Sequence, residues 1–342
     1  MLNSLFKEPL FERSAPCLTL RGLPLGFVDV GARGGVHDLV APIAGVTAVL
    51  AFEPDEEECR KLSSQSARNS PWSKCLFQPA ALAGGETQAT LYALSSPVNS
   101  SLRMPNPAFV RRYGMKGYEL NQTIPLKTRS LDSVIFDLLG GGDPWGEFLK
   151  IDCQGGTHEI LEGAERTLAE RTVAIFAEVE FFEMYAGEKL FSEVELFLRN
   201  RGFSFYGFEL HFRSSRLLDK RTSAGRERTF WADAVFFKDP LAGGAWKGPF
   251  PERAQHVLFV CALLLEYFDF ALQLSLETWA KGEEADRIRS LVARRSALRA
   301  SHASQEALAL FEAVRAHPDE AVLHVGRFVD RRRHLSDYDD VV

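Results

Sequence analysis

The sequence has little cysteine, and none of it forms a motif. The five cysteines are far apart, odd in number and never spaced as C-x-x-C. This argues against a disulfide framework and against a structural zinc site. We therefore expect a reducing compartment and a cytoplasmic location. The cysteines are Cys17, Cys59, Cys75, Cys153 and Cys261.

An excess of positive charge is also lacking. The 342 residues carry a formal net charge of −6, which argues against nucleic acid as the main partner, because phosphates are bound mostly by Lys and Arg. No apolar h-region of a signal peptide precedes Leu25, since charged residues such as Lys7 and Glu8 interrupt that segment. The apolar stretch 256–274 contains Glu266 and Asp269, so we expect a core or interface helix there and no membrane span.

The sequence does contain an apolar run that ends in a glycine turn. A second apolar run, Val49 to Phe52, ends in Glu53 at the spacing expected for a nucleotide-binding β-α-β unit. In such units the glycines let the backbone approach the ligand, and the second acid binds the ribose hydroxyls. The first run and its turn read Phe27-Val28-Asp29-Val30-Gly31-Ala32-Arg33-Gly34-Gly35.

One residue of this turn discriminates between nucleotides. The dinucleotide fingerprint G-x-G-x-x-G has its last two glycines at Gly31 and Gly34, but its first position is Asp29. A carboxylate there would repel the pyrophosphate of NAD. It suits S-adenosylmethionine, which has no phosphate and carries sulfonium and ammonium groups. An NAD-dependent oxidoreductase stays as a less favoured alternative.

Strand and helix patterns alternate from residue 25 to residue 238, which predicts a doubly wound α/β sheet. Residues 95–121 lack strong periodicity, and a loop of this length is usually functional or disordered. From Pro251 on, glycine nearly vanishes and helix formers dominate. We therefore divide the chain into an N-terminal lead-in (1–24), an α/β domain (25–240) and an all-helical extension (251–342) that serves as an oligomerisation or lid element.

Several segments together resemble the FkbM-type family of S-adenosylmethionine-dependent methyltransferases, over about residues 25–238. The glycine turn and Phe52-Glu53-Pro54 are two of them. The most specific is Leu149-Lys150-Ile151-Asp152-Cys153-Gln154-Gly155, which continues into Glu159-Ile160-Leu161-Glu162-Gly163-Ala164. The resemblance implies a class I methyltransferase fold, Rossmann-like, with a seven-stranded, mostly parallel sheet whose last strand is antiparallel. It also implies methyl transfer from S-adenosylmethionine to a hydroxyl oxygen of a sugar, glycan or natural product.

The resemblance also assigns cofactor-binding residues. The glycine turn would line the methionine end of the cofactor, Glu53 would hold the ribose hydroxyls, and two alanines would lie by the adenine. Asp152 would face the transferred methyl group, in agreement with the rule that ligands bind beyond the carboxyl ends of the strands. The residues are Asp29, Gly31, Ala32, Gly34, Glu53, Ala80, Ala81 and Asp152.

An alcohol acceptor needs a general base within hydrogen-bond reach. We expect Asp152 in this role, with Glu178 and His211 as further catalytic candidates, and a carboxylate that only caps the next helix as the alternative for Asp152. Glu180 joins Asp152 and Glu178 as a possible metal ligand, but nothing in their spacing favours a metal, so we predict a metal-independent reaction.

One position departs from the family pattern. The family usually has a glutamate where this chain has Thr157, and His158 and Glu159 are adjacent substitutes. The missing carboxylate motivates a second hypothesis, a non-catalytic module that binds S-adenosylmethionine and takes part in assembly or regulation. The helical extension could support either hypothesis as the interface of a homo-oligomer.

Overall fold

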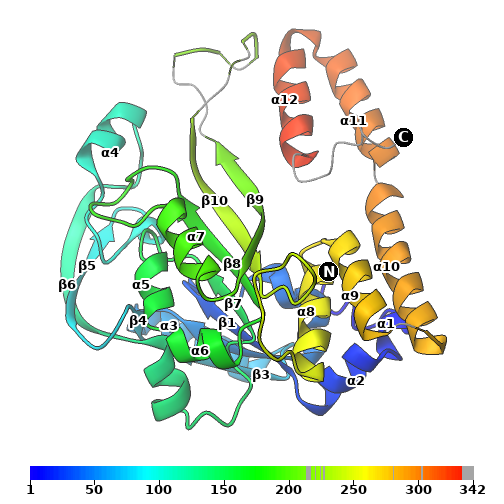
Figure 1. Cartoon of the computed structure of the whole chain (residues 1–342). Helices are drawn as coiled ribbons and strands as arrows, with labels where there is room; N and C mark the ends of the chain where they lie inside the picture. Colours follow the sequence, from blue (N-terminus) through cyan, green and yellow to red (C-terminus); the bar gives the residue numbers. More distant parts are fainter. Residues whose placement is uncertain are drawn as a thin grey trace.

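A seven-stranded sheet runs through the molecule in the order β3-β2-β1-β7-β8-β10-β9 (Figure 1). The computed structural model describes residues 1–212, 217–219, 221–223, 225, 228–279, 281–301 and 303–332. All strands run parallel except β10, which is antiparallel to both of its neighbours. The strands are β1 (Leu25–Val30), β2 (Thr47–Phe52), β3 (Lys74–Gln78), β7 (Phe148–Ile151), β8 (Ala174–Glu180), β9 (Ser204–Phe212) and β10 (Thr229–Phe237).

The strands bury both faces because helices cover both sides of the sheet. Successive side chains of a strand point to opposite faces, so Phe27 belongs to one apolar core and Val28 to the other. One face is covered by η3 (Ser133–Leu138), α5 (Thr157–Glu162), α6 (Glu165–Glu170) and α7 (Phe191–Arg199). The doubly wound, seven-stranded, mostly parallel sheet and its antiparallel last strand are thus confirmed.

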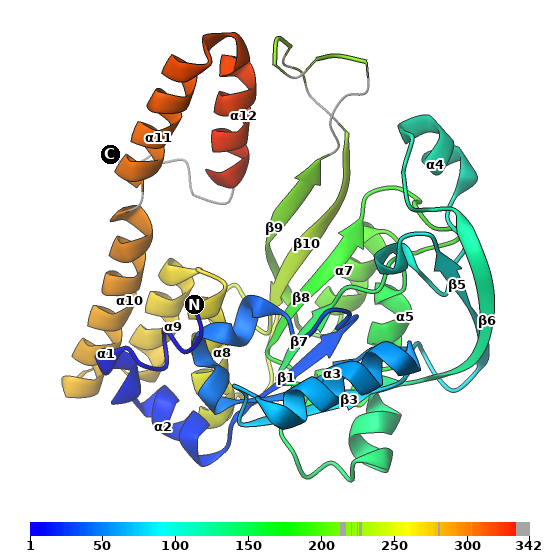
Figure 2. The same ribbon diagram turned by 180° about the vertical axis from the view of Figure 1, so that it is seen from behind.

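The other face is covered by helices from both ends of the chain and from the loops after β1 and β2 (Figures 1 and 2). The lead-in, predicted to have little periodicity, forms α1 (Pro9–Glu12) and α2 (Ala15–Gly22), and it packs on the C-terminal helices. Ala15 N donates to Glu284 at 2.7 Å, and Thr19 Oγ1 lies 2.7 Å from His256 Nδ1. The remaining helices of this layer are η1 (Asp38–Val46), α3 (Glu56–Arg68), α8 (Glu252–Leu264), α9 (Phe268–Thr278) and α10 (Glu283–Ser301).

The apolar stretch 256–274 forms two helices, α8 and α9, instead of one. The chain turns at Glu266, which has a left-handed φ of 64°. Residues 256–263 are buried against the sheet and α2. This stretch belongs to the core of the chain and does not leave an apolar outer surface. Packing thus joins α8, α9 and most of α10 to the α/β domain. Among the described helices, none combines the length and the apolarity that a membrane span requires.

The last helices stand apart from the sheet beyond the end of α10 (Figures 1 and 2). They are α11 (Ala303–Ala316), the short η4 (Pro318–Glu320) and α12 (Ala321–Arg332). None of the residues of α11 is buried.

A small second sheet flanks the carboxyl end of the main one. It has the order β4-β6-β5, with β4 (Ala81–Leu82), β5 (Gln88–Leu94) and β6 (Leu120–Arg129). The segment 95–119 between β5 and β6 contains η2 (Pro97–Asn99) and α4 (Pro107–Tyr113). Phe109 of α4 and Tyr185, from the loop after β8, share a third apolar cluster. We call β5, β6 and this segment the cap, because they cover the loops that follow β7 and β8.

Candidate active site

The glycine turn after β1 is built by close backbone approach. The amides of Gly31 and Ala32 donate to Phe52 O at 3.2 and 3.0 Å, which ties the turn to the end of β2. Gly31 has a φ of +82°, and a Cβ there would lie 1.8 Å from Asp152 O. Only glycine permits both the conformation and the approach of the β7 end. The end of β1 is therefore held between the ends of β2 and β7.

The outer side of the same turn is open. Gly34 and Gly35 have φ values of +87° and +124°, and a Cβ on either would meet no atom within 4 Å. The backbone is thus bare where a ligand would approach it. Ala32, by contrast, is buried on the inner side of the turn.

Asp29 lies beneath the turn instead of lining it. Its side chain is 0% exposed; Oδ1 is 3.1 Å from Lys150 Nζ and Oδ2 accepts from His37 N at 2.8 Å. Burial lowers the pKa of Lys150, but the nearby carboxylates of Asp29 and Asp152 raise it by a larger amount, so the net shift is upward. In the structure this carboxylate is the buried partner of Lys150, and its place at the methionine end of the cofactor stays a prediction.

Glu53 immediately follows β2 and is 3% exposed. Burial raises the pKa of this carboxyl, while the Asp55 amide and the Arg33 guanidinium lower it. Asp55 N donates to Glu53 Oε1 at 2.9 Å, and Arg33 Nη1 is 3.5 Å from the same oxygen. Arg33 comes from the glycine turn, so one side chain of the turn offsets part of the rise in pKa that burial causes at the acid after β2.

The two alanines expected by the adenine follow β3, the next strand in the sheet. Ala80 is half-buried and donates its amide to Gln78 O at 2.9 Å. Ala81 is buried in β4 and pairs with Thr128 of β6. The ends of β1, β2, β3 and β7 thus carry all the predicted cofactor residues, on four adjacent strands of the sheet.

Asp152 and Glu178 are brought together by a residue to which the sequence analysis gave no role. Gln154 Nε2 donates to Asp152 Oδ1 at 3.1 Å and to Glu178 Oε1 at 3.0 Å. The side chain of Asp152 is 42% exposed, whereas Glu178 is buried. Tyr185 Oη lies 2.8 Å from Gln154 Oε1 and 3.0 Å from Asn99 O in the cap. The motif after β7 contains Gln154, but no signal in the sequence points to Tyr185.

A buried set of acids continues from Glu178 toward the cap. Burial raises the pKa of Glu178 well above its usual range, and the neighbouring Asp152 adds to the effect. Burial also raises the pKa of Glu180, and among its charged neighbours Glu188 adds most to this rise. Burial also raises the pKa of Glu188 to about 7, although the amides of Tyr185 and Met184 donate to it. These groups therefore favour the protonated form more strongly than exposed acids do.

The cap is fastened to this edge by its own polar contacts. Ser101 Oγ donates to Gln154 O at 2.6 Å. Arg103 bridges Glu159 of α5 at 2.6 Å and the carbonyl of Gly187 at 2.8 Å. The long segment predicted to be a functional or disordered loop thus contains helices and lies directly over the loops after β7 and β8.

His211 is not brought near this group. It is on β9, where its backbone pairs with Trp231 of β10, and Trp231 pairs in turn with Glu180 of β8. Asp152 follows β7, so three strand spacings, roughly 14 Å, separate the two backbones. The side chain of His211 lies outside the described part of the chain. The structure brings Asp152 and Glu178 together, and the catalytic role of His211 stays a prediction.

Thr157 fills a structural position. It is the first residue of α5, is buried, and donates Oγ1 to Glu178 O at 2.8 Å. Its two neighbours have other contacts: His158 packs edge-to-face on Phe197, and Glu159 pairs with Arg103.

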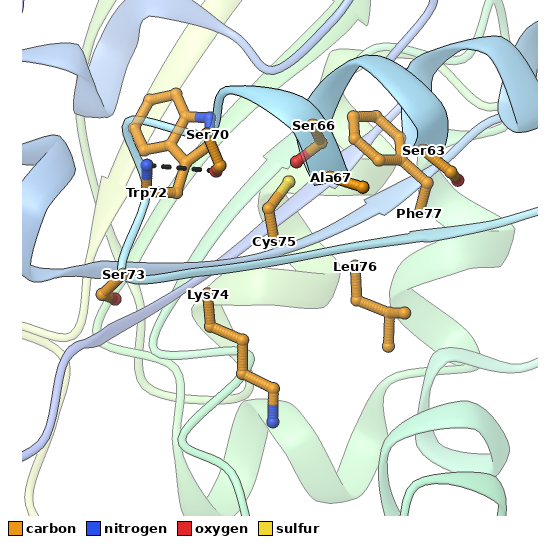
Figure 3. A pocket seen from close by; sticks show the side chains of 10 residues that line it. All are labelled: Ser63, Ser66, Ala67, Ser70, Trp72, Ser73, Lys74, Cys75, Leu76 and Phe77. Atoms are coloured by element: carbon orange, nitrogen blue, oxygen red, sulfur yellow. Dashed lines mark hydrogen bonds between the residues drawn. The ribbon is translucent and has the colours of Figure 1, made fainter.

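A surface pocket lies elsewhere, at the edge of the sheet between α3 and β3 (Figure 3). None of its lining residues belongs to the predicted site. Four serines line it, together with Ala67, Trp72, Lys74, Cys75, Leu76 and Phe77. Among the described residues, no group of three or more His, Cys, Asp or Glu side chains is arranged to hold a metal ion.

The fold and the site together define a class. A seven-stranded sheet with an antiparallel last strand, a glycine turn after the first strand and an acid after the second is the arrangement of class I methyltransferases, which use S-adenosylmethionine.

Sequence comparison specifies the family. The model of the FkbM methyltransferase domain matches residues 29–205, more than half of the 342 residues. The chain therefore belongs to the FkbM methyltransferase family. No curated protein sequence gives a significant match.

Similar solved structures include an FkbM methyltransferase from Methylobacillus flagellatus KT, with 15% identity and a TM-score of 0.34. The alignment covers 63% of this chain but only 43% of that one. Another is the magnesium protoporphyrin IX methyltransferase of Synechocystis PCC 6803 with bound S-adenosylmethionine, with 7% identity, a TM-score of 0.30, and coverage of 66% of this chain and 76% of that one. The assignment rests on the match to the family, not on these distant likenesses.

Family membership makes S-adenosylmethionine the cofactor, and features of this structure fit it. The bare backbone at Gly34 and Gly35 can be approached closely, and the Glu53 carboxylate on the adjacent strand suits ribose hydroxyls.

Proposed function

We propose that this chain is an S-adenosylmethionine-dependent O-methyltransferase that acts on a hydroxyl group of a sugar, glycan or natural product. The observation that carries the proposal is the half-exposed carboxylate of Asp152. It follows β7, directly beside the glycine turn and below the cap. A base in this place lies between a cofactor bound at the turn and an acceptor bound under the cap.

The residues divide into two groups in this proposal. The turn from Gly31 to Gly34, whose backbone is open at Gly34, would hold the methionine end, with Asp29 and Ala32 supporting the turn from beneath. Glu53 would accept the ribose hydrogen bonds. Ala80 and Ala81 would lie by the adenine. Asp152 belongs to both groups, because it borders the turn and the acceptor side.

When bound, S-adenosylmethionine supplies an electrophilic methyl group and leaves as the neutral thioether. The chain must then orient the acceptor oxygen and remove its proton. Asp152 is the base we assign, because its carboxylate is accessible and already accepts a hydrogen bond from Gln154. Glu178, buried behind it, would hold or receive the proton.

The proposal is tested by incubating the purified protein with S-adenosylmethionine labelled in the methyl group and separate pools of sugar nucleotides, glycans and polyols. We expect label in at least one hydroxylated pool and its loss in the Asp152→Asn variant. Transfer to nitrogen or sulfur acceptors alone would contradict the O-methyltransferase assignment.

Thr157 favours a second candidate, a module that binds S-adenosylmethionine without transferring its methyl group. It lies where the family usually has glutamate, and its hydroxyl donates a hydrogen bond to the carbonyl of Glu178 in β8. Tight binding of S-adenosylmethionine with no transfer to any pool would support this candidate. Binding of NAD alone would reject both.

We also propose that the helical extension forms a homo-oligomer. The support is an apolar stripe on each helix of the α11–α12 hairpin, at helical spacing and exposed to solvent: Leu308 and Phe311 on α11, and Val322, Val325 and Val329 on α12. Two such hairpins related by a twofold axis would bury these stripes as a four-helix bundle.

Sedimentation of the full chain tests this. We expect a dimer that dissociates in the Phe311→Asp and Val325→Asp variants, with Val98→Asp, at an exposed apolar residue outside this hairpin, as the control. A wild-type monomer at all concentrations would contradict it.

A cytoplasmic location also remains a proposal, supported by five free cysteines.

A further inference from the structure

Gln154 makes four polar contacts with four different segments of the chain. Its amide nitrogen donates to Asp152 and Glu178, and its amide oxygen faces Tyr185 Oη at 2.8 Å. Its backbone carbonyl accepts from Ser101 Oγ at 2.6 Å. These contacts connect the end of β7, the end of β8, the loop after β8 and the cap.

The chemistry of a primary amide suits this position. An amide offers two N–H donors and one acceptor oxygen. Both donors serve carboxyl groups, and the acceptor faces a hydroxyl. A glutamate of the same length would have no donors when ionised and would add another acidic group beside Asp152 and Glu178.

The backbone at this point is also unusual. Gln154 has a φ of 56°, in the left-handed region that non-glycine residues seldom adopt. Such conformations persist where the surroundings hold them, and they cluster at functional sites. The left-handed turn directs the side chain back toward Asp152 and Glu178.

We propose that Gln154 is a positioning residue, which holds the carboxyl groups of Asp152 and Glu178 as a pair and fixes this pair to the cap through Tyr185. Its role in methyl transfer rests on the proposed function. The pairing itself does not, and it can be tested without an acceptor.

Other charged groups also face the pair. Asp152 and Glu180 raise the pKa of Glu178, Asp233 of β10 raises it further, and Lys150 lowers it. Since burial raises this pKa too, replacement of the amide by a carboxyl group adds an acid to a site where acids already resist ionisation.

The first experiment measures the melting temperature from pH 5 to pH 8 for the full-length wild type and three variants. In Gln154→Glu, we expect a loss that grows with pH to roughly 5 °C at pH 8, because the new carboxyl must ionise beside two others. Gln154→Met removes the donors without adding charge, so its loss should change little with pH. Gln122→Glu adds a carboxyl at an exposed position of β6 and serves as the control.

The second experiment measures binding and turnover. Calorimetry should give an affinity for S-adenosylmethionine within about threefold of wild type for Gln154→Met, since the residue lies on the acceptor side. With any acceptor found, kcat should fall by about 10²-fold and its pH profile should shift, because misplaced catalytic groups lose rate more than cofactor binding.

A pH-independent loss in Gln154→Glu that equals the Gln122→Glu loss would overturn the proposal. If wild type turns over no acceptor, the proposed function fails, but the pH-dependent melting of Gln154→Glu still decides whether Gln154 pairs the acids. If turnover exists and Gln154→Met keeps its kcat and pH profile, the positioning role is rejected.

Discussion

The turn after β1 and the network after β7 lie on neighbouring strands, yet they are held by different kinds of contact. The turn is fixed mainly by backbone hydrogen bonds to Phe52 and by one buried ion pair, Asp29–Lys150. The network is fixed by side chains, with Gln154 in contact with groups from β8 and from the cap. The cofactor half of the site is therefore held mainly by contacts between adjacent strands of the sheet, while the acceptor half depends on side chains from the cap and from the loop after β8.

This difference predicts that the two halves of the site can be changed separately. A change in the cap or in the loop after β8 alters the acceptor half without touching the backbone of the glycine turn. The following changes test that separation, beginning with the one that should have the largest effect.

Lys150→Met should break the cofactor half. The Lys150 side chain is 4% exposed and that of Asp29 is 0% exposed. Removal of the cation leaves a buried, unpaired carboxylate, at a cost of about 3–5 kcal/mol in the free energy of unfolding. Urea denaturation measures this, with Lys61→Met, whose ion pair with Glu58 is on the surface, as the control. A loss no larger than that of the control would mean that the pair does not hold the turn.

Asp152→Asn should break the acceptor half and leave the cofactor half intact. Loss of the base should reduce kcat by about 10²-fold, equivalent to about 2.7 kcal/mol. Calorimetry should show an affinity for S-adenosylmethionine within a few-fold of wild type. If the affinity for S-adenosylmethionine fell by as large a factor as kcat, Asp152 would belong to the cofactor half alone.

Glu188→Gln should sharpen the comparison through the pH dependence of stability. The pKa of Glu188 is raised from 4.5 to about 7, so the folded state binds this proton more tightly than the unfolded state. The stabilisation that this tighter proton binding adds to the free energy of unfolding is fully present below pH 4.5 and is lost as the pH rises to about 7. The variant should therefore gain roughly 2–4 °C in melting temperature relative to wild type between pH 5 and pH 8.

The matched control for this prediction is Glu193→Gln, an exposed acid of α7. An equal slope of melting temperature with pH in wild type and Glu188→Gln would show that Glu188 does not titrate in this range.

Arg33→Ala should have the smallest effect, and only on the cofactor half. Without this cation the pKa of Glu53, already raised by burial, rises further. The ribose-binding carboxylate would then protonate more readily on acidification. We expect affinity for S-adenosylmethionine to fall about fivefold at pH 5.5, about 1 kcal/mol, and less at pH 8. If the variant lost affinity for S-adenosylmethionine by the same factor at both pH values, the contact between Arg33 and Glu53 would be contradicted. Arg60→Ala, at an exposed position of α3, is the control.

Much of the cofactor half was predictable because it is encoded in short motifs. The apolar run before Asp29, the glycines and the acid at Glu53 specify a strand, a turn and a neighbouring strand in a fixed order. One contact in this half was not predicted. Lys150, more than a hundred residues away, neutralises Asp29 from beneath, and no local pattern reveals that pairing.

The acceptor half was less predictable because its contacts join segments that lie far apart in the sequence. Asp152 and Glu178 were expected at strand ends, but strand order alone puts His211 three strands away from Asp152. Tyr185 can contact both Gln154 and Asn99 only after the cap folds over the sheet. The lead-in helices α1 and α2 escaped prediction as well, because they are short and are stabilised by packing on α8 and α10.

The most direct test of this account is calorimetric titration of the purified chain with S-adenosylmethionine, S-adenosylhomocysteine and NAD, for wild type and Glu53→Ala. We predict binding of the first two ligands by wild type, at least tenfold weaker binding by Glu53→Ala, and no binding of NAD. A folded wild-type protein that binds neither S-adenosylmethionine nor S-adenosylhomocysteine would contradict the account, since the glycine turn would then serve the fold alone.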